Sequence, residues 1–330
     1  MIRRRGRRCL RPAIGHIIGF RVRYRRVLCI YNPSAGRGIS QWKLEALQQA
    51  LSVHVSEVRL APTSLSGHAT DLAKQAAVEG CDLVAVYSGD GTVNEVVQGL
   101  AGMPSPALLV LPGGTANVLA NELGLPIDPL MAARLLPQLA AKPVRLGQAI
   151  FSNNNDQSRY FLLMCGAGLD AAVADRVSKP LKRRLGQAAF WLAGARFSLQ
   201  RFPRARISGA DNGASSPSCG LVVVSKSRLY GGGLVLTPGA SLLADHFITA
   251  QYPGANRLVY GSYLAAAKCH LMSKCPGVLL EPREDLVLEP AAADRVQVQL
   301  DGEVVGELPA RITLSDATCT VLMPESYMSA

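Results

Sequence analysis

The feature that most constrains the fold of this chain is an alternation of short apolar runs with helix-forming segments between residues 26 and 142. The apolar runs have the length and composition of buried strands, and they cover residues 27–31, 53–60, 83–87 and 108–111. The segments between and after them carry apolar residues at helical spacing, over residues 41–50, 67–78, 93–100 and 116–123. This alternation predicts a mostly parallel sheet with helices on both faces and a ligand site at the carboxyl ends of its strands.

The pattern changes at residue 143, where short strand-like runs are joined by clusters of Gly, Pro, Asn and Ser. These runs cover residues 144–151, 160–165, 205–208, 221–225, 247–252, 285–289, 296–300 and 311–314. They predict an antiparallel β domain, interrupted by a helix near residues 174–202 and by another near residues 260–273. We therefore expect an α/β domain over residues 26–142 and a β-rich domain over residues 143–330 that completes a cleft.

The positive charge of the chain is concentrated in its first 26 residues, which hold ten arginines and no acidic residue. The formal net charge is +11, so the remainder of the chain carries only +1. A basic arm on a nearly neutral body fits an anionic membrane surface, and nucleic acid is not the expected partner. The alternative is that residues 1–25 are a disordered extension, or that they arise from an upstream start codon.

The composition excludes several other classes of protein. Hydrophobic residues make up 48% of the chain and charged residues 18%, which excludes a disordered protein. No uncharged apolar run reaches the roughly 18 residues that a membrane span needs, so a transmembrane enzyme is not expected. The eight cysteines include no CxxC pair, which argues against a zinc site or a disulfide framework and predicts the reducing cytosol.

Three of the predicted strands run directly into glycine-rich loops, and each loop precedes a predicted helix. The loops cover residues 32–38, 88–92 and 112–117. Glycine lets backbone N–H groups approach a phosphate closely, and the amino end of the following helix adds a favourable dipole. A single loop of this kind is typical of an ordinary turn, but three at one edge of a sheet indicate a polyphosphate ligand.

The second loop carries a carboxylate, Asp90, between Gly89 and Gly91. A carboxylate beside phosphates repels them unless a cation lies between, so Asp90 is interpreted as a ligand of Mg²⁺, directly or through water. The alternative is that Asp90 or Thr92 caps the helix that begins near Val93. Neither the spacing of a P-loop nor the dinucleotide fingerprint GxGxxG is present.

The three loops resemble, in order and in spacing, the nucleotide-site motifs of the diacylglycerol and sphingosine kinase family. The sequence reads NPSAG at 32–36, SGDGTVNEVV at 88–97 and LPGGTAN at 111–117. The similarity continues with LGLP at 123–126, GAGLD at 166–170, YGGG at 230–233 and DGE at 301–303. NAD kinases and phosphofructokinases share the bare glycine element, but the VNE continuation and the TAN loop are similar to lipid kinases.

This resemblance implies an NAD kinase/diacylglycerol kinase-like two-domain fold, with an N-terminal parallel-sheet α/β domain and a C-terminal antiparallel β-rich sandwich. It also implies phosphorylation of a lipid hydroxyl by ATP and Mg²⁺ in the cleft between the domains. The residues that it places at the nucleotide are Asn32, Pro33, Ser34, Ala35, Gly36, Arg37, Gly38, Thr63, Ser88, Gly89, Asp90, Gly91, Thr92, Val93, Asn94, Glu95, Gly114, Thr115 and Asn117. In its own local context, Thr63 is also expected as a turn or capping residue before the helix at 67–78.

The expected general base lies near the end of the chain, in residues 296–305. Locally this segment is a hairpin with an Asp-Gly turn, which by itself accounts for Asp301 and Gly302. A kinase also needs a group that accepts the proton of the attacking hydroxyl, and a carboxylate in the cleft is the usual one. In similar bacterial enzymes the Glu of Asp-Gly-Glu has that role, which implies Glu303 as the base, with Asp301 close to the same chemistry.

One segment departs from the pattern of the family. Members usually show an Asp-Asp-Gly element that is associated with a second, largely structural Mg²⁺ site in the β domain. Here residues 241–247 contain Asp245 as their only acid and no glycine. Asp245 is thus a candidate ligand of a second Mg²⁺, and an ordinary turn residue is the alternative.

Together these features predict a cytoplasmic lipid kinase, peripherally associated with the membrane, that phosphorylates a lipid such as diacylglycerol to give phosphatidic acid. Asp90, Asp301 and Glu303 are its expected catalytic residues. Two alternatives stay open: a kinase of another acceptor, such as a sphingoid base or NAD, and a non-catalytic regulator that binds nucleotide or lipid. The sequence does not fix the oligomeric state, and a homodimer is one option.

Overall fold

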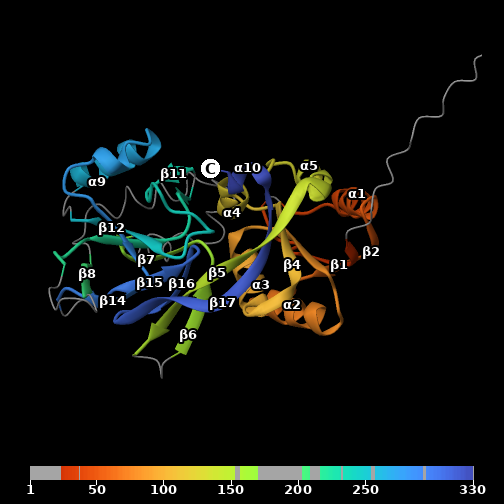
Figure 1. Cartoon of the computed structure of the whole chain (residues 1–330), viewed down its shortest axis with the longest axis horizontal. Helices are drawn as coiled ribbons and strands as arrows, with labels where there is room; N and C mark the ends of the chain where they lie inside the picture. The colour runs from red at the N-terminus through yellow and green to blue at the C-terminus, as the bar shows by residue number, and fades with distance from the viewer. Residues whose placement is uncertain are drawn as a thin grey trace, which may run out of the picture.

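The computed structural model of the chain describes residues 24–36, 38–152, 157–169, 203–208, 216–231, 233–253, 257–292 and 295–329. In this part of the chain, an α/β half lies on the right of Figure 1 and a β-rich half on the left. The predicted basic arm up to residue 23, Arg37 and the predicted helix at 174–202 lie outside the described residues. No helix among the described residues is both long enough and apolar enough to cross a bilayer.

The α/β half confirms the predicted alternation of strands and helices. Its parallel strands lie in the order β2-β1-β3-β4, with bounds β1 (Tyr24–Tyr31), β2 (Val55–Pro62), β3 (Leu83–Ser88) and β4 (Met103–Pro112). Its helices are α1 (Gln41–Ser52), α2 (His68–Val78), α3 (Asp90–Leu100), α4 (Val118–Glu122) and α5 (Pro129–Arg134), followed by the short 3₁₀ helix η1 (Leu136–Gln138). Every residue of β3 is buried, which explains why this central strand is a continuous apolar run in the sequence.

The β-rich half is dominated by antiparallel pairs, as predicted. Its strands are β5 (Leu139–Phe151), β6 (Gln157–Phe161), β7 (Met164–Gly168), β8 (Ala205–Ser208), β9 (Leu221–Ser225), β10 (Leu229–Tyr230), β11 (Leu234–Val235), β12 (Phe247–Tyr252), β13 (Leu279–Arg283), β14 (Asp285–Pro290), β15 (Gln297–Leu300), β16 (Glu303–Glu307) and β17 (Ala310–Pro324). Its described helices are α9 (Arg257–Lys268), η2 (Met272–Lys274) and α10 (Glu325–Met328). Six of the strands form one antiparallel sheet in the order β13-β12-β9-β7-β15-β16.

The last strand, β17, belongs to both halves. It pairs in parallel with β4 and antiparallel with β5 and β14, so the first sheet continues as β2-β1-β3-β4-β17-β14-β8. Figure 1 shows β5 and β17 running side by side from the α/β half into the β-rich half. The predicted strand at 311–314 is therefore too short, because the polar residues Ser315, Asp316 and Thr318 hide the continuation of the strand from a search for apolar runs.

The predicted single strand at 160–165 is wrong, since the chain leaves one sheet and enters the other within it. β6 ends at Phe161 in the first sheet, and β7 begins at Met164 in the second. Where the chain crosses between the sheets, the backbone N–H groups of Leu162, Leu163 and Met164 donate to the carboxylate of Asp301. A contact with a residue so distant in the sequence cannot be read from local apolar periodicity.

An apolar core between the two sheets confirms the sandwich. It is formed by buried side chains of β5, β6 and β17 on one side and of β7, β9 and β12 on the other. The rings of Phe161 in β6 and Phe247 in β12 stack with their centroids 5.6 Å apart. A larger core fills the α/β half around β1, β3 and β4, so the glycine loops at the ends of these strands stand on a rigid base.

Candidate active site

The three glycine loops contact one another at the carboxyl ends of β1, β3 and β4. The backbone N–H of Gly113 donates to the carbonyl oxygen of Ser88 at 3.0 Å. A methyl group built on Gly36 would lie 2.8 Å from the carbonyl oxygen of Gly113, and one built on Gly89 would lie 3.2 Å from the Cα of Gly114. Side chains at these positions would fill the space between the loops. The glycines therefore leave a continuous surface of backbone, which is the kind of cradle that a polyphosphate fits.

Two asparagines among the predicted site residues hold the shapes of the first and third loops. The Oδ1 atom of Asn32 accepts a hydrogen bond from the backbone N–H of Ser34 at 2.9 Å. The side chain of Asn117 accepts from the N–H of Gly114 at 2.8 Å and donates to its carbonyl oxygen at 3.0 Å. Asn117 itself has a left-handed backbone with φ of 46°. Both side chains thus satisfy backbone groups that a tight loop would otherwise leave without partners.

Asp90 is the first residue of α3, and Gly89 is the N-cap. The alternative that Asp90 or Thr92 caps a helix beginning near Val93 is therefore wrong, because the extended backbone of Gly89 lets the helix start three residues earlier. The carboxylate of Asp90 reaches another helix instead, where its Oδ1 atom accepts from the backbone N–H of Val118 at 2.6 Å. Val118 is the first residue of α4, so Asp90 joins the second glycine loop to the third.

Glu303 lies directly over the second glycine loop. The predicted Asp-Gly turn between β15 and β16 is confirmed, with positive φ at Asp301 (49°) and Gly302 (91°), and Glu303 follows it as the first residue of β16. A methyl group built on Gly91 would lie 2.5 Å from Oε1 of Glu303. The fold therefore brings the carboxylate of Glu303, from the last part of the chain, to the residue that follows Asp90.

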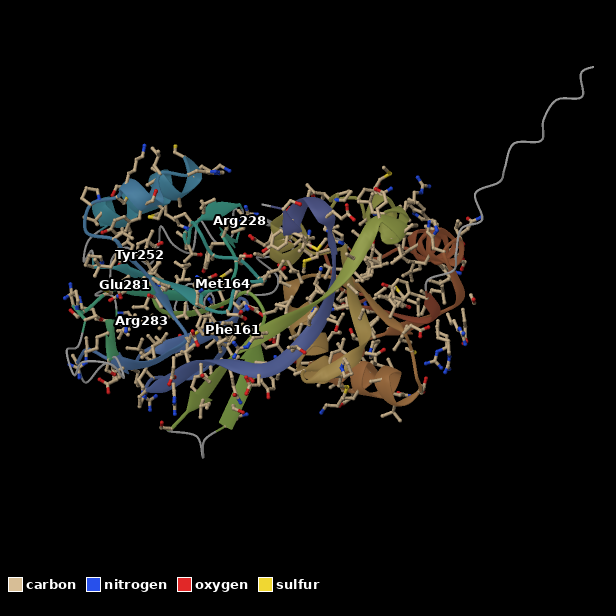
Figure 2. The ribbon with its side chains drawn as sticks, viewed as in Figure 1. Phe161, Met164, Arg228, Tyr252, Glu281 and Arg283 are labelled. Atoms are coloured by element: carbon tan, nitrogen blue, oxygen red, sulfur yellow. The ribbon has the colours of Figure 1, made fainter. Side chains whose placement is uncertain are left out.

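Asp301 lies in the interior, below this turn. Its carboxylate accepts four hydrogen bonds of 2.8–2.9 Å, from the side chain of Asn94 and from the backbone N–H groups of Leu162, Leu163 and Met164. Met164 is labelled in Figure 2. Burial raises the pKa of Asp301, and the hydrogen bonds from these donors oppose that rise. The carboxylate thus fixes the turn that carries Glu303 against the connection between β6 and β7.

One face of α3 binds the β-rich half through Asn94 and Gln98. The side chain of Gln98 donates to the carbonyl oxygen of Tyr160 at 2.7 Å and accepts from its N–H at 3.0 Å. It also donates to Oδ1 of Asn94 at 3.4 Å. Gln98 was not among the predicted site residues, although its spacing of four residues from Asn94 places both on one helical face. α3 therefore begins at the glycine loops and continues into the contact between the two halves.

Glu95 and Thr63 lie at the edge of the predicted site. The carboxylate of Glu95 accepts from the backbone N–H of Ala69 at 3.2 Å and from the hydroxyl of Ser66 at 3.4 Å, so it faces the amino end of α2. The backbone N–H of Thr63 donates to the carbonyl oxygen of Tyr31 at 2.8 Å. Thr63 therefore lies beside the end of β1, where the first glycine loop begins.

The other predicted residues lie on α3 and on the three glycine loops. Val93 is buried in the core of the α/β half. The hydroxyl of Ser88 donates to that of Thr92 at 2.8 Å, across the second loop. The remaining positions lie on the first and third loops: Pro33, Ala35, Gly38 and Thr115.

A buried carboxylate that the sequence analysis missed joins α4 to the β-rich half. The side chain of Glu122 is 0% exposed and accepts from the hydroxyls of Ser227 (3.0 Å) and Tyr327 (3.2 Å) and from the N–H of Leu229 (3.0 Å). It also accepts from Nε of Arg228 at 3.1 Å, and that guanidinium lies over the ring of Tyr327. Figure 2 labels Arg228. No local signal marks this cluster, because its members come from three separate parts of the chain.

Asp245, the predicted second metal ligand, lies on the surface of the β-rich half. Its side chain is 82% exposed, and its Oδ1 atom lies 3.7 Å from Nη1 of Arg145. Across the described ranges, no three side chains of the types His, Cys, Asp and Glu gather as a metal cluster.

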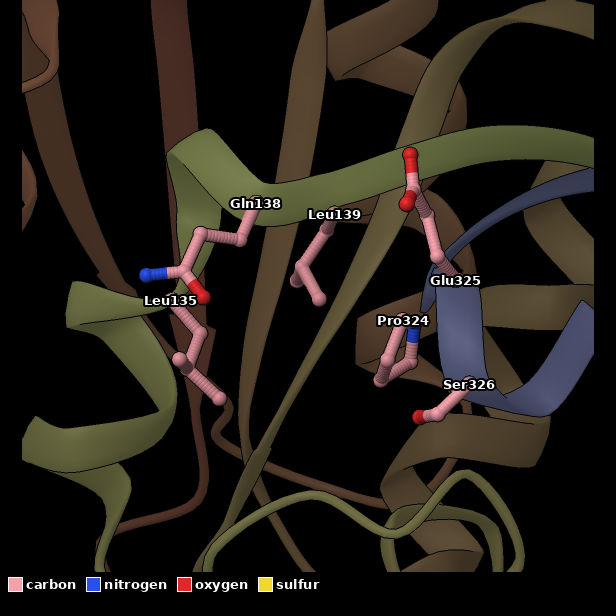
Figure 3. A pocket seen from close by; sticks show the side chains of 6 residues that line it. All are labelled: Leu135, Gln138, Leu139, Pro324, Glu325 and Ser326. Atoms are coloured by element: carbon pink, nitrogen blue, oxygen red, sulfur yellow. The ribbon is translucent and has the colours of Figure 1, made fainter.

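A pocket of about 480 Å³ lies between η1, the start of β5 and the start of α10. Figure 3 shows Leu135 and Gln138 on one side and Pro324, Glu325 and Ser326 on the other, with Leu139 between them. None of these residues belongs to a glycine loop or to the predicted site, so the pocket is separate from the candidate active site.

Comparison with known proteins finds relatives that match both halves of the chain. Residues 26–149 match the family model described as the diacylglycerol kinase catalytic domain. The chain is 30% identical over 305 residues to a diacylglycerol kinase of Bacillus subtilis, which covers 91% of this chain and 97% of the relative. It is also 30% identical over 272 residues to a Pseudomonas aeruginosa protein named as a YegS-like lipid kinase, covering 81% and 85%. The fold matches a crystal structure of a diacylglycerol kinase from Bacillus anthracis with a TM-score of 0.72 at 23% identity, covering 92% and 98%.

Proposed function

The chain belongs to the diacylglycerol kinase family and is a lipid kinase, and we propose that it transfers the γ-phosphoryl group of Mg²⁺-ATP to the hydroxyl of diacylglycerol. The product would be phosphatidic acid. The acceptor is taken from the names of the relatives in Bacillus and Staphylococcus. The observation that carries the proposal is the position of the Glu303 carboxylate over Gly91, which follows Asp90 in the second of the three glycine loops.

The residues of the loops fit a magnesium nucleotide. The close approach of Gly36 and Gly89 to neighbouring backbone keeps side chains out of the space between the loops, so phosphate oxygens could reach the loop backbone. Asp90 supplies an acid at the amino end of α3, where it would hold the metal, directly or through water. When bound, Mg²⁺ would neutralise negative charge on the phosphates. The hydrogen bond from Val118 holds one oxygen of the Asp90 carboxylate in place.

Glu303 is the proposed general base. Its carboxylate would accept the proton of the lipid hydroxyl as that oxygen attacks the γ-phosphorus. Asp301 is assigned a positioning role, because its four hydrogen bonds fix the turn from which Glu303 projects. Catalysis would then consist mainly of holding the reacting groups in line and accepting one proton.

The two halves would have separate roles in the reaction, as the sequence suggests. Residues 26–142 would bind the nucleotide, and residues 143–330 would supply the base and complete the cleft. The lipid would be taken from a membrane surface with the enzyme attached peripherally, and the ten arginines of the first 26 residues would favour an anionic surface.

The test is transfer of radiolabelled γ-phosphate from ATP to a panel of lipids in mixed micelles with Mg²⁺. The panel contains diacylglycerol, sphingosine and monoacylglycerol, and NAD is assayed as a soluble acceptor. The variants are Asp90→Ala and Glu303→Gln. The matched control is Glu307→Gln, which makes the same change at the other end of β16, where the carboxylate lies 3.9 Å from an exposed arginine.

We expect label on diacylglycerol with wild type and Glu307→Gln, and a loss of about 10²–10⁴-fold in kcat with Glu303→Gln. Label on sphingosine or NAD instead would replace the proposed acceptor. Saturable ATP binding with no label on any acceptor would indicate a binding protein without kinase activity.

A further inference from the structure

The turn that joins β11 to β12 is where the sequence predicts a second Mg²⁺, through Asp245. The donor set found there does not fit a divalent cation. Such ions take about six to eight oxygen ligands, usually with several carboxylates. Asp245 is the only acid of the turn, it is largely exposed, and it faces the guanidinium of Arg145.

The inner side of the same turn already holds a cation, the ammonium group of Lys226. Lys226 follows β9 and is 1% exposed. Its Nζ atom donates to the carbonyl oxygen of Arg145 at 3.0 Å and to that of Ala244 at 2.9 Å. The first carbonyl belongs to β5 and the second to the turn, next to Asp245. Two backbone carbonyls from separate segments thus converge on one positive group, which is an arrangement that metal ions also use.

We propose that the Lys226 ammonium takes the place of the divalent cation at this turn and ties the turn to β5 without a metal. The charges nearby agree with this assignment. The guanidinium of Arg145 pairs with the carboxylates of Asp245 (3.7 Å) and Asp316 (3.3 Å), so the acid that could attract a metal is already partnered. The ammonium and the guanidinium together would repel a further divalent cation.

This assignment concerns the β-rich half and does not depend on the reaction. Its test is therefore the thermal unfolding of the full chain without nucleotide, in EDTA, in Mg²⁺ and in Ca²⁺, together with the metal content after dialysis. For wild type we expect the same unfolding midpoint in EDTA and in either metal, and no divalent metal retained.

Two lysine variants separate the buried ammonium from a general loss of charge. Lys226→Met removes the buried ammonium that donates to the carbonyls of Arg145 and Ala244, so we expect its midpoint to fall by several degrees. Lys142→Met makes the same change at an exposed position of β5 and should leave the midpoint unchanged. Equal midpoints for the two variants would contradict the proposal. If Lys226→Met does not fold, the proposal is still tested by comparing the unfolding midpoint of wild type in EDTA with its midpoint in Mg²⁺ or Ca²⁺.

A third variant tests whether the ammonium and a metal are interchangeable. Lys226→Ala combined with Ala244→Asp removes the ammonium and adds a second carboxylate to the turn. We expect this double variant to gain a Ca²⁺- or Mg²⁺-dependent rise in midpoint that wild type lacks. The proposal is overturned if EDTA lowers the wild-type midpoint and that effect disappears in Asp245→Ala, because a metal would then lie at this turn. An EDTA effect that persists in Asp245→Ala places the metal elsewhere and leaves the proposal standing.

Discussion

Gly91 and Gly99 lie about two turns apart on α3, and each excludes a side chain for a different reason. A methyl group at Gly91 would meet the flexible end of Glu303, with its Oε1 atom 2.5 Å away. A methyl group at Gly99 would meet α2, with the carbonyl oxygen of Thr70 at 2.5 Å and the Cβ of Ala73 at 2.8 Å. The first position thus concerns a proposed reacting group, and the second concerns the packing of two helices.

Gly91→Ala and Gly99→Ala should therefore separate catalysis from stability. Gly91→Ala displaces the Glu303 carboxylate, so kcat should fall roughly 10²-fold while the free energy of unfolding changes little. Gly99→Ala forces α2 away from α3 and should cost about 1–3 kcal/mol of stability. Steady-state kinetics and urea unfolding of both variants provide the measurement. A large loss of stability in Gly91→Ala with unchanged kcat would show that Glu303 is not held over this loop for catalysis.

At the scale of elements, the cluster around Glu122 connects three segments that are distant in the sequence. The carboxylate lies at the end of α4, its partners Ser227 to Leu229 lead from β9 into β10, and Tyr327 lies on α10. A buried carboxylate with four donors is stable only while those donors remain. This cluster therefore fixes the helix behind the third glycine loop relative to the β-rich half.

Removal of the charge partner should destabilise the chain more than removal of a neutral donor. Arg228→Met leaves the buried charge of Glu122 without its guanidinium and should cost roughly 2–4 kcal/mol. Tyr327→Phe removes the hydrogen bond to Glu122 and the one that the hydroxyl accepts from the N–H of Leu242 at 3.0 Å, but it keeps the ring beneath the guanidinium, so it should cost about 1–2 kcal/mol. Urea unfolding ranks the two variants. Adding Glu122→Gln to Arg228→Met should recover part of the loss, and strict additivity of the two changes would argue against a coupled pair.

At the scale of the whole molecule, β5 and β17 make one structure of the two halves. Both strands run through the two regions, and the same sheet contains β1 at one side and β14 and β8 at the other. The order and the continuity of this sheet imply that the halves lose their structure together.

Thiol labelling during unfolding measures this cooperativity. Cys29 lies in β1 of the α/β half and Cys165 in β7 of the second sheet, and both are buried. We expect a thiol reagent to modify both with one midpoint in urea, while the exposed Cys269 reacts before unfolding. Peptide mapping by mass spectrometry assigns the sites. Two separate midpoints for Cys29 and Cys165 would show that the halves unfold independently.

Two buried thiols, Cys29 in β1 and Cys319 in β17, predict a loss of stability at alkaline pH. Burial raises the pKa of Cys29 and of Cys319 to about 12, from an ordinary value of 9.0. The folded protein therefore keeps these thiols protonated after the unfolded chain has begun to ionise them. The contribution of the two protonated thiols to the free energy of unfolding is complete below pH 9. It is lost as the pH rises from 9 towards 12, by up to about 1.4 kcal/mol per thiol and pH unit. Urea unfolding between pH 8 and 10 should show a shallower decline for Cys319→Ala than for wild type, and parallel declines would contradict this account.

The sequence was sufficient for features that are encoded locally, and insufficient for pairings between distant segments. The apolar run of β3, the glycine loops and the Asp301–Gly302 turn each depend on neighbouring residues, and each was predicted. The pairing of β17 with β4, the hydrogen bond from Asn94 to Asp301 and the partners of Glu122 were not, because apolar periodicity identifies a buried face without naming what covers it. The role of Glu303 as the base was predicted only through resemblance to a known family, and its position over Gly91 was not predicted.

The place of β17 beside β4 has a consequence for synthesis on the ribosome. β1 to β4 emerge first, but the strand that covers the free edge of β4 consists of residues 310–324. During most of translation, that edge presents unpaired backbone groups to other nascent chains. The α/β half therefore has to wait for nearly the entire chain before its own sheet is closed, and chaperones that shield this edge should matter more for its yield than for its final stability.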